Sequence, residues 1–242
     1  MLIGKEPVIF DPPLIIISPA EYSPTRPMNH YGILADLLPD SLRTLYNSIM
    51  NFTLNDDAFP NFIETIECSL KNPRGWCSLK LREKANQFGK TRIETTYLCL
   101  SFNASVVKIW PPGHYSPIHH HQDACGVTRV LHGKLLIKYF PMLSLHLHPT
   151  SLIEQLFEKD SVTWMMPKLN QTHQMKNPDM YGSCCITIES FQYETDEQTG
   201  LECFRYITND HHRIENYRCV PDDTYQAFKR TMQMESTWTN TT

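Results

Sequence analysis

The segment GHYSPIHHHQDACGVTRVLHG, which runs from Gly113 to Gly133, places three consecutive histidines in a stretch of β-type sequence. In a β-strand, side chains at positions i and i+2 point to one face, and the side chain at i+1 points to the other. His119 and His121 are therefore expected to converge inside the domain, with His120 facing outward. Two converging imidazoles predict part of a metal site, which needs at least one further ligand from a neighbouring strand.

The candidate for this further ligand is His173, in the segment LNQTHQMKNP. It follows a β-type run and comes just before the Asn177-Pro178 turn. Asn170, three residues earlier, is one of the few residues other than glycine that tolerate the left-handed conformation of a tight turn. The sequence thus predicts a three-histidine metal site.

A second H-x-H pair, His146 and His148, competes with this interpretation. It lies beside Pro149, and no third histidine stands at a useful distance. We interpret these two as surface histidines, and we interpret three further residues in the same way: His30, His211 and His212.

The region around the histidines consists of short β-type runs separated by turn-forming residues. They lie between Thr91 and about Tyr206 and read YLCLSF, SVVKIW, VTRVL, KLLIKYF, SVTWMM and CCITIESF. An ambiguous stretch from Ser151 to Phe157 is the one helical candidate among them. Many short strands at close spacing predict an antiparallel sandwich or barrel.

Helical sequence flanks the β region on both sides. Apolar residues recur at helical spacing in residues 41–52 and 62–70, and again in 222–234, where Asp222 and Asp223 are expected in the first turn. We therefore expect a single domain over residues 1–242, in three parts. These are a helical and extended segment at about 1–88, a β core at about 89–206 and a C-terminal helical extension at about 207–242.

The composition is that of a globular protein, with 41% hydrophobic residues, 20% charged residues and a formal net charge of −4. No run of lysine or arginine is present, which argues against nucleic acid or an acidic membrane surface as a partner. The apolar N-terminal segment is interrupted well short of the roughly 20 residues of a membrane span. Eight cysteines without a C-x-x-C pair predict free, mostly buried thiols. A cytoplasmic protein is expected, as a monomer or weak homodimer.

The first histidine segment resembles the first motif of the cupin family, G-x5-H-x-H-x4-E-x6-G. Gly113 begins the match, His119 and His121 form the pair, and Gly133 closes it. The glutamate that many cupins carry is replaced by Gly126. The second cupin motif ends in H-x3-N, and the segment that begins at His173 fits this pattern as well.

The segment from Trp110 to His121, WPPGHYSPIHHH, resembles the iron-site segment of cysteine dioxygenase, which carries W-x-x-G-H-x-S-x-I-H-x-H. The resemblance extends from about Trp76 to Tyr193. It implies a cupin fold, an all-β jelly-roll barrel or sandwich, here with helices on both flanks. It also implies that His119, His121 and His173 ligate a ferrous ion, Fe(2+).

This resemblance implies a thiol dioxygenase that adds O2 to the sulfur of L-cysteine or a related thiol acid and yields the sulfinic acid. The ligand set is chemically consistent with that role. Three neutral imidazoles leave the ion its full charge and several open positions on one face. An anionic thiolate and dioxygen can then meet in one coordination sphere. The expected partners are a small thiol and O2.

The resemblance further implies which residues bind the substrate. Arg92 lies nearly where family members place an arginine upstream of the H-x-H pair, so it is the candidate clamp for a carboxylate. Trp110, Tyr115 and Ser116 are expected to line or support the pocket. Glu189 either points inward, where it would pair with a substrate amine or with Arg92, or faces solvent.

Two departures from the family pattern leave the identity of the thiol open. Gly126 stands where mammalian-type members carry a cysteine that cross-links to a tyrosine, and Cys125 is its neighbour. Thr187 and Glu189 stand near the histidine and tyrosine positions of the family, and Tyr193 is four residues further along. The substrates that stay open include 3-mercaptopropionate, a cysteine derivative and the N-terminal cysteine of a peptide.

Two alternative functions are also compatible with the pattern. One is a three-histidine cupin oxygenase that cleaves a carbon–carbon bond, which would need a wide apolar pocket and no arginine clamp. The other is a non-catalytic cupin that binds a small ligand or holds zinc, since three histidines and a water suit zinc well.

Overall fold

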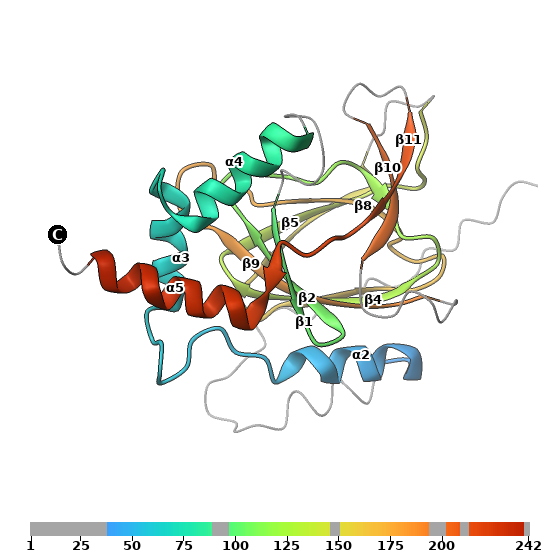
Figure 1. Ribbon diagram of the computed structural model, residues 1–242. Coiled ribbons are helices and arrows are strands. Elements are labelled where there is room, and N and C mark those ends of the chain that lie inside the picture. The colour runs from blue at the N-terminus through green and yellow to red at the C-terminus, as the bar shows by residue number, and fades with distance from the viewer. Residues whose placement is uncertain (1–37, 89–96, 146–150, 194–201, 209–212, 240–242) are drawn as a thin grey trace, which may run out of the picture.

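The computed structural model describes residues 38–88, 97–145, 151–193, 202–208 and 213–239. Within these ranges, two six-stranded sheets pack face to face, and helices cover the outer face of one of them (Figure 1). The helices are α2 (Asp40–Met50), α3 (Phe62–Lys71), α4 (Trp76–Phe88) and α5 (Tyr225–Thr239).

The first sheet has the strand order β12 (Asp223–Thr224), β1 (Leu98–Phe102), β2 (Ser105–Trp110), β9 (Cys185–Gln192), β4 (Cys125–His132) and β7 (Val162–Met165). The second sheet has the order β11 (Ile214–Arg218), β10 (Cys203–Ile207), β3 (His119–His120), β8 (Thr172–Lys176), β5 (Lys134–Tyr139) and β6 (Ile153–Glu158).

The chain passes repeatedly from one sheet to the other as it forms these strands. Neighbouring strands pair antiparallel, except that β12 lies parallel to β1. Two antiparallel sheets that exchange the chain in this way form a jelly roll, the double-stranded β-helix of cupins. The predicted fold class, an all-β cupin with flanking helices, is confirmed.

The first sheet is buried on both faces, and the sequence of its strands reflects this. On β1 and β2, Leu98, Leu100 and Val107 pack into the core beneath the helices, together with Phe62 and Phe228. Alternate residues of the same strands, such as Val106 and Trp110, pack between the two sheets. A strand covered on both faces reads as a largely apolar run instead of a regular alternation, as in SVVKIW and CCITIESF.

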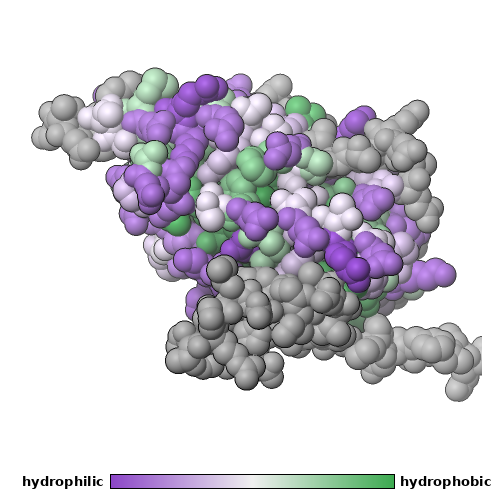
Figure 2. Space-filling view, turned by 90° about the horizontal axis from the view of Figure 1, so that it is seen from below, coloured by the Kyte–Doolittle hydropathy of each residue, from purple (hydrophilic) through white to green (hydrophobic). Residues whose placement is uncertain are grey.

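The helices bury their apolar faces on this sheet and leave polar faces outside. Helix α2, which lies below the sheet in Figure 1, buries Leu42, Leu45, Tyr46 and Ile49. The surface seen from below carries mostly hydrophilic side chains with small apolar patches between them (Figure 2). None of the helices in the described ranges combines the length and apolar character that crossing a membrane requires.

Helices α2 and α3 fall where helical periodicity predicts them, but the C-terminal helix begins later than expected. It starts at Tyr225, and Asp223 belongs to β12. Asp222 forms an ion pair with Lys84, at 2.8 Å between Nζ and Oδ2, and accepts a hydrogen bond from the Cys99 amide. The predicted place of Asp222 and Asp223 in the first helical turn is wrong, because a tertiary ion pair and strand pairing recruit them.

Two other segments also differ from the sequence expectation. The ambiguous stretch from Ser151 to Phe157 forms most of β6, an edge strand, and not a helix. Strands β10 and β11 continue past residue 206 into the expected helical extension, so the second sheet ends only at Arg218.

All eight cysteines are free thiols and six are buried, as predicted. Arg92 and the His146/His148 pair lie outside the described residues.

Phe228→Ala tests the core beneath the helices. Phe228 is fully buried and packs against Phe62 and Trp76, so truncation should lower the free energy of unfolding by about 3–5 kcal/mol. Urea denaturation followed by circular dichroism measures the change. Met234→Ala on the same helix is the control, since Met234 is 56% exposed and should cost less than about 0.5 kcal/mol. Equal effects of the two changes would contradict this packing.

Candidate metal centre

The three histidines come together because β3 and β8 are paired antiparallel. The register places His119 directly opposite His173, and His121 follows two residues after His119. The ligand atoms of the three side chains all lie within 4.8 Å of one another, and all three residues are buried. Positive φ angles at Gln122 and Asp123 turn the chain back immediately afterwards into β4.

Backbone carbonyls orient two of the three imidazoles. His119 Nδ1 lies 3.0 Å from the Pro117 carbonyl oxygen, and His173 Nδ1 lies 2.8 Å from that of Asn170. Asn170 has φ +57°, the left-handed conformation predicted for it. These contacts leave Nε2 of His119 and Nε2 of His173 as the atoms that can bind a metal.

Unpartnered nitrogen atoms mark the centre of this group. Among the described side chains, His119 Nε2 and His121 Nδ1 are buried without a hydrogen-bond partner. Buried polar atoms are nearly always paired, so the lack of a hydrogen-bond partner at these two nitrogens is consistent with a role as metal ligands. His120 points away: it is half-buried, and its Nδ1 lies 2.9 Å from Thr172 Oγ1.

Burial keeps the three imidazoles neutral at pH 7. It lowers the pKa of His119 and His121 well below the usual value, and their histidine neighbours add to the effect. For His173, burial lowers the pKa to about 4, although the hydrogen bond to the Asn170 carbonyl opposes the shift. Neutral imidazole is the form that ligates a metal, so the site is prepared for binding without losing protons.

A buried charge cluster lies beside the histidines. Lys108 on β2 bonds to Glu189 on β9 at 2.8 Å and to Glu202 at 2.6 Å, and all three side chains are 1% exposed. Tyr97 donates a hydrogen bond to Glu202, and Thr187 donates one to Glu189. We call these five residues the Lys108 cluster.

The Lys108 cluster carries more negative than positive charge, and it reaches one of the metal ligands. Burial disfavours the ammonium, but Glu189 and Glu202 outweigh this and raise the pKa of Lys108. Burial raises the pKa of Glu202 to about 6, although Lys108 opposes the shift. Glu202 Oε1 lies 3.9 Å from His121 Nε2, so a carboxylate stands behind that ring.

Sequence reasoning missed Lys108 and Glu202. A signal for Lys108 was present, because a lysine interrupts the apolar run SVVKIW at a position that alternation assigns to the interior face. Glu202 carried no comparable signal. Its role depends on the chain returning beside β3, which local sequence does not show.

Two of the three histidines, His121 and His173, line a narrow cavity of about 20 Å³. Its walls combine polar groups, from Glu189, Tyr139 and Thr163, with apolar groups that include Trp164, Met165 and Phe191. Phe191 also stacks on the His121 ring, with centroids 5.2 Å apart. In this conformation the cavity has room for little more than one water molecule beside the ligand atoms.

Two of the residues expected to line or support the pocket are buried near the site, and a third is exposed. Ser116 is buried and supports the site, since its Oγ accepts the Met175 amide and lies 3.4 Å from His119 Nδ1. Trp110 is buried and donates from Nε1 to Thr187, which in turn donates to Glu189. Tyr115 is 53% exposed and does not line the cavity, contrary to expectation. Its strand neighbour Ser116 turns inward, so Tyr115 must turn outward.

Two open points of the sequence analysis are resolved by the packing. Glu189 faces the cavity and not solvent. It pairs with Lys108 and also accepts a hydrogen bond from Thr187. Gly126 has no room for a side chain, because a Cβ there would lie 2.7 Å from Met165 Cε and 2.9 Å from Phe191 Cδ1. Cys125 belongs to the core on the helix side, so its thiol does not enter the cavity.

Comparisons with known proteins find resemblance at the level of fold only. No family model and no curated protein matches the chain. Oxalate oxidase in complex with the substrate analogue glycolate aligns with 38% of this chain and 42% of its own, at 19% identity and a TM-score of 0.30. The chain thus spans less than half the length of that oxidase.

Two smaller domains align over similar stretches. One is a Cupin_2 domain of an XRE family transcriptional regulator from Enterobacter cloacae (38% of this chain, 81% of that chain, 14% identity, TM-score 0.29). The other is an uncharacterized protein with a double-stranded β-helix domain from Klebsiella pneumoniae (40% and 77%, 17% identity, TM-score 0.30). The chain's own strand pairing and side chains define the class: a cupin fold with a group of three histidines that can hold a metal ion.

Lys108→Met tests the buried charge cluster. The change leaves Glu189 and Glu202 buried beside each other without a cation, so the free energy of unfolding should fall by about 3–5 kcal/mol. Lys138→Met is the matched control: its ion pair with Glu154 is exposed and should be worth less than about 1 kcal/mol. Urea denaturation of both variants measures the difference, and a loss below 1 kcal/mol at Lys108 would contradict the cluster.

The depressed pKa of His173 makes the metal-free chain sensitive to acid. The unfolded chain takes up a proton as pH falls through 6.5, whereas the folded chain does so only near 4. Stability contributed by neutral His173 is therefore lost as pH falls, by about 2 kcal/mol at pH 5 relative to pH 7. Urea denaturation at both pH values should show this loss, and His173→Gln should reduce it. An unchanged pH dependence in the variant would refute the assignment.

Proposed function

We propose that this chain is a ferrous thiol dioxygenase, in which His119, His121 and His173 hold the iron and a small thiol is oxidised to its sulfinic acid. The observation that carries the proposal is a ligand group made of histidine alone, buried and neutral. Such a group leaves a divalent ion with its full charge, which favours an anionic thiolate as the next ligand.

The Lys108 cluster supports this interpretation. Two carboxylates, Glu189 and Glu202, lie close to the histidines and would be strong ligands for a divalent ion. Both are bound to the Lys108 ammonium instead. The cluster thereby keeps carboxylates out of the ligand group while holding negative charge behind His121.

Ferrous iron, when bound, supplies the redox chemistry through which dioxygen reacts with a thiolate. The residues of the chain fix the ligands and exclude water. Pro117 and Asn170 orient the rings of His119 and His173, and Phe191 stacks on His121. Both oxygen atoms enter the product, RSH + O2 → RSO2H, so the reaction needs no external reductant.

The cavity supports a small substrate that carries a polar group. Its volume of about 20 Å³ is little more than one water molecule needs, so a thiol that binds there must displace the surrounding side chains, and a bulky aromatic substrate must displace more of them. The Glu189 carboxylate and the Tyr139 hydroxyl on its wall suit the amine of an aminothiol such as L-cysteine. Arg92 remains the sequence-based candidate for binding a carboxylate.

Oxygen uptake by protein prepared without oxygen and loaded with ferrous iron tests the proposal. L-cysteine, 3-mercaptopropionate and a peptide with an N-terminal cysteine are supplied in parallel, and the sulfinic acid is measured by mass spectrometry. We expect uptake with one of these thiols, with one O2 consumed per sulfinate formed. His173→Ala should abolish it, because the iron loses a ligand.

His120→Ala is the matched control. It removes an imidazole from the same histidine run, but His120 faces Thr172 and away from the ligand group. Activity and iron content should both persist in this variant. Absence of uptake with every thiol, at one iron per wild-type chain, would overturn the proposal and favour a cupin that holds its metal without oxygenating a thiol.

A further inference from the structure

A second group of metal-ligating side chains lies on the helix-covered side of the first sheet. Glu67 on α3, His132 at the end of β4 and Cys184 just before β9 each offer one ligand atom, and these atoms lie within 4.8 Å of one another. Glu67 Oε1 and His132 Nε2 are 3.3 Å apart. Three elements far apart in sequence thus bring a carboxylate, an imidazole and a thiol to one point.

The backbone holds this group in place. Gly133, which follows His132, has φ +73°, and a Cβ there would lie only 2.5 Å from the Cys184 carbonyl oxygen. Only glycine permits this conformation together with such a close approach. The end of β4 is therefore fixed against the start of β9, and His132 is held beside Cys184.

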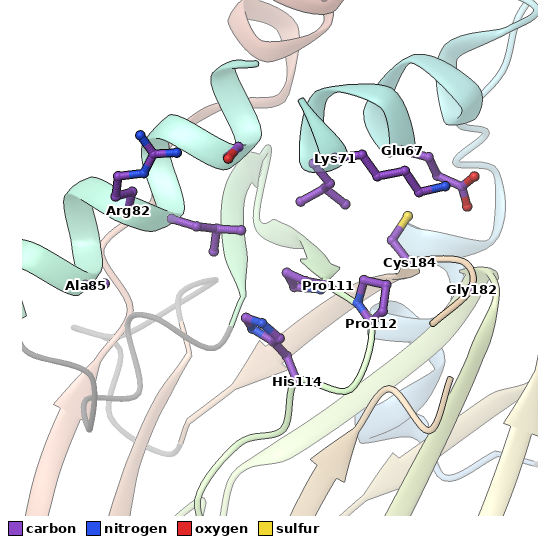
Figure 3. Close-up of a pocket in the computed structure, with 12 residues that line it drawn as sticks. Glu67, Lys71, Arg82, Ala85, Pro111, Pro112, His114, Gly182 and Cys184 are labelled. Carbon is purple, nitrogen blue, oxygen red and sulfur yellow. The ribbon is translucent and has the colours of Figure 1, made fainter. Parts of the chain in front are cut away.

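A cavity of about 420 Å³ opens beside the group, between α3, α4 and the segment after β2. Glu67 and Cys184 line it, together with Lys71, Arg82 and His114. In Figure 3, the Cys184 sulfur points from the strand end toward the helix that carries Glu67 and Lys71. A ligand held by the three side chains would therefore keep one side open to the cavity.

The donor set matches the preferences of zinc. Thiolate, imidazole and carboxylate are the three ligand types that Zn²⁺ uses, and sites with three protein ligands keep a fourth position for water or another small ligand. A thiolate and a carboxylate together neutralise a divalent cation. Lys71 and Arg82 on the cavity wall suit water or an anion at the fourth position.

We propose that Glu67, His132 and Cys184 form a second metal site, suited to zinc, whose fourth position faces this cavity. The site is independent of the three histidines and does not rest on the thiol dioxygenase proposal. Burial and the nearby Glu67 raise the pKa of the Cys184 thiol, so the metal-free group holds a proton on sulfur. Zinc binding replaces that proton by a zinc–sulfur bond and releases it to solvent.

Cobalt titration of the full chain without oxygen separates the two sites. Co²⁺ occupies zinc sites with the same geometry, and a thiolate ligand gives it a charge-transfer absorption in the near ultraviolet that three imidazoles cannot produce. We expect two cobalt ions per chain, with the thiolate band, in the wild type. Cys184→Ala should bind one ion and lose the band.

Cys185→Ala is the matched control, since it removes the neighbouring buried thiol, which lies on the opposite face of the strand. This variant should keep two ions and the band. Glu67→Gln and His132→Gln change half-buried side chains, so these variants are expected to fold. They test the proposed metal site if Cys184→Ala fails to fold. Each should weaken the cobalt affinity reported by the band at least about tenfold.

Three results would overturn the second site. In the first, the wild-type chain binds no more than one ion and shows no band. In the second the band persists in Cys184→Ala, and in the third the cobalt affinity is unchanged in both glutamine variants. The first result would assign the Glu67–His132 contact to an ion pair only. Loss of the ion at the three histidines would leave the band in place, so failure there is distinguished from failure here.

Discussion

The ammonium group of Lys108 is the constraint on which the interior of this protein depends. Taking one cation and two carboxylates out of water costs several kcal/mol for each charge, and good mutual geometry must offset that cost. Lys108 and Glu189 belong to neighbouring strands of the first sheet, whereas Glu202 immediately precedes β10 of the second. The cluster therefore joins the two sheets and fixes how they stack around the histidines.

This constraint also affects the group of three histidines. His121 is the member of the three-histidine group that approaches the cluster, at 3.9 Å from Glu202, and Phe191 stacks on its ring. A shift of β9 relative to β2 would move Glu189, Phe191 and the cavity wall together. The ligand geometry is thus determined by the long-range packing of two sheets as much as by the short strand that carries His119.

Much of the fold and part of the site follow from local sequence. Alternation and turn residues locate most strands. The spacing of His119, His121 and His173 predicts that these side chains converge, because a strand determines which side chains share a face. The errors arise where distant contacts prevail over local preference. Asp222 has the sequence of a helix start but pairs with Lys84. Tyr115 is a different kind of error, because local alternation with the inward-facing Ser116 already turns its side chain to solvent. Glu202 acquires its role only from a strand pairing that no local pattern encodes.

Strand β12, which pairs with β1, is made late, because the ribosome synthesises the chain from its N-terminus. This order affects when the described structure can be completed. The segments that complete the structure, which are synthesised after all the other described elements, are Glu202, β10, β11, β12 and α5. Several of them contact residues made much earlier. Until they emerge from the ribosome, Lys108 lacks one of its carboxylates, β3 lacks a neighbour and α3 lacks the helix that covers it. The packing around the three histidines can therefore be completed only after these late segments have been added.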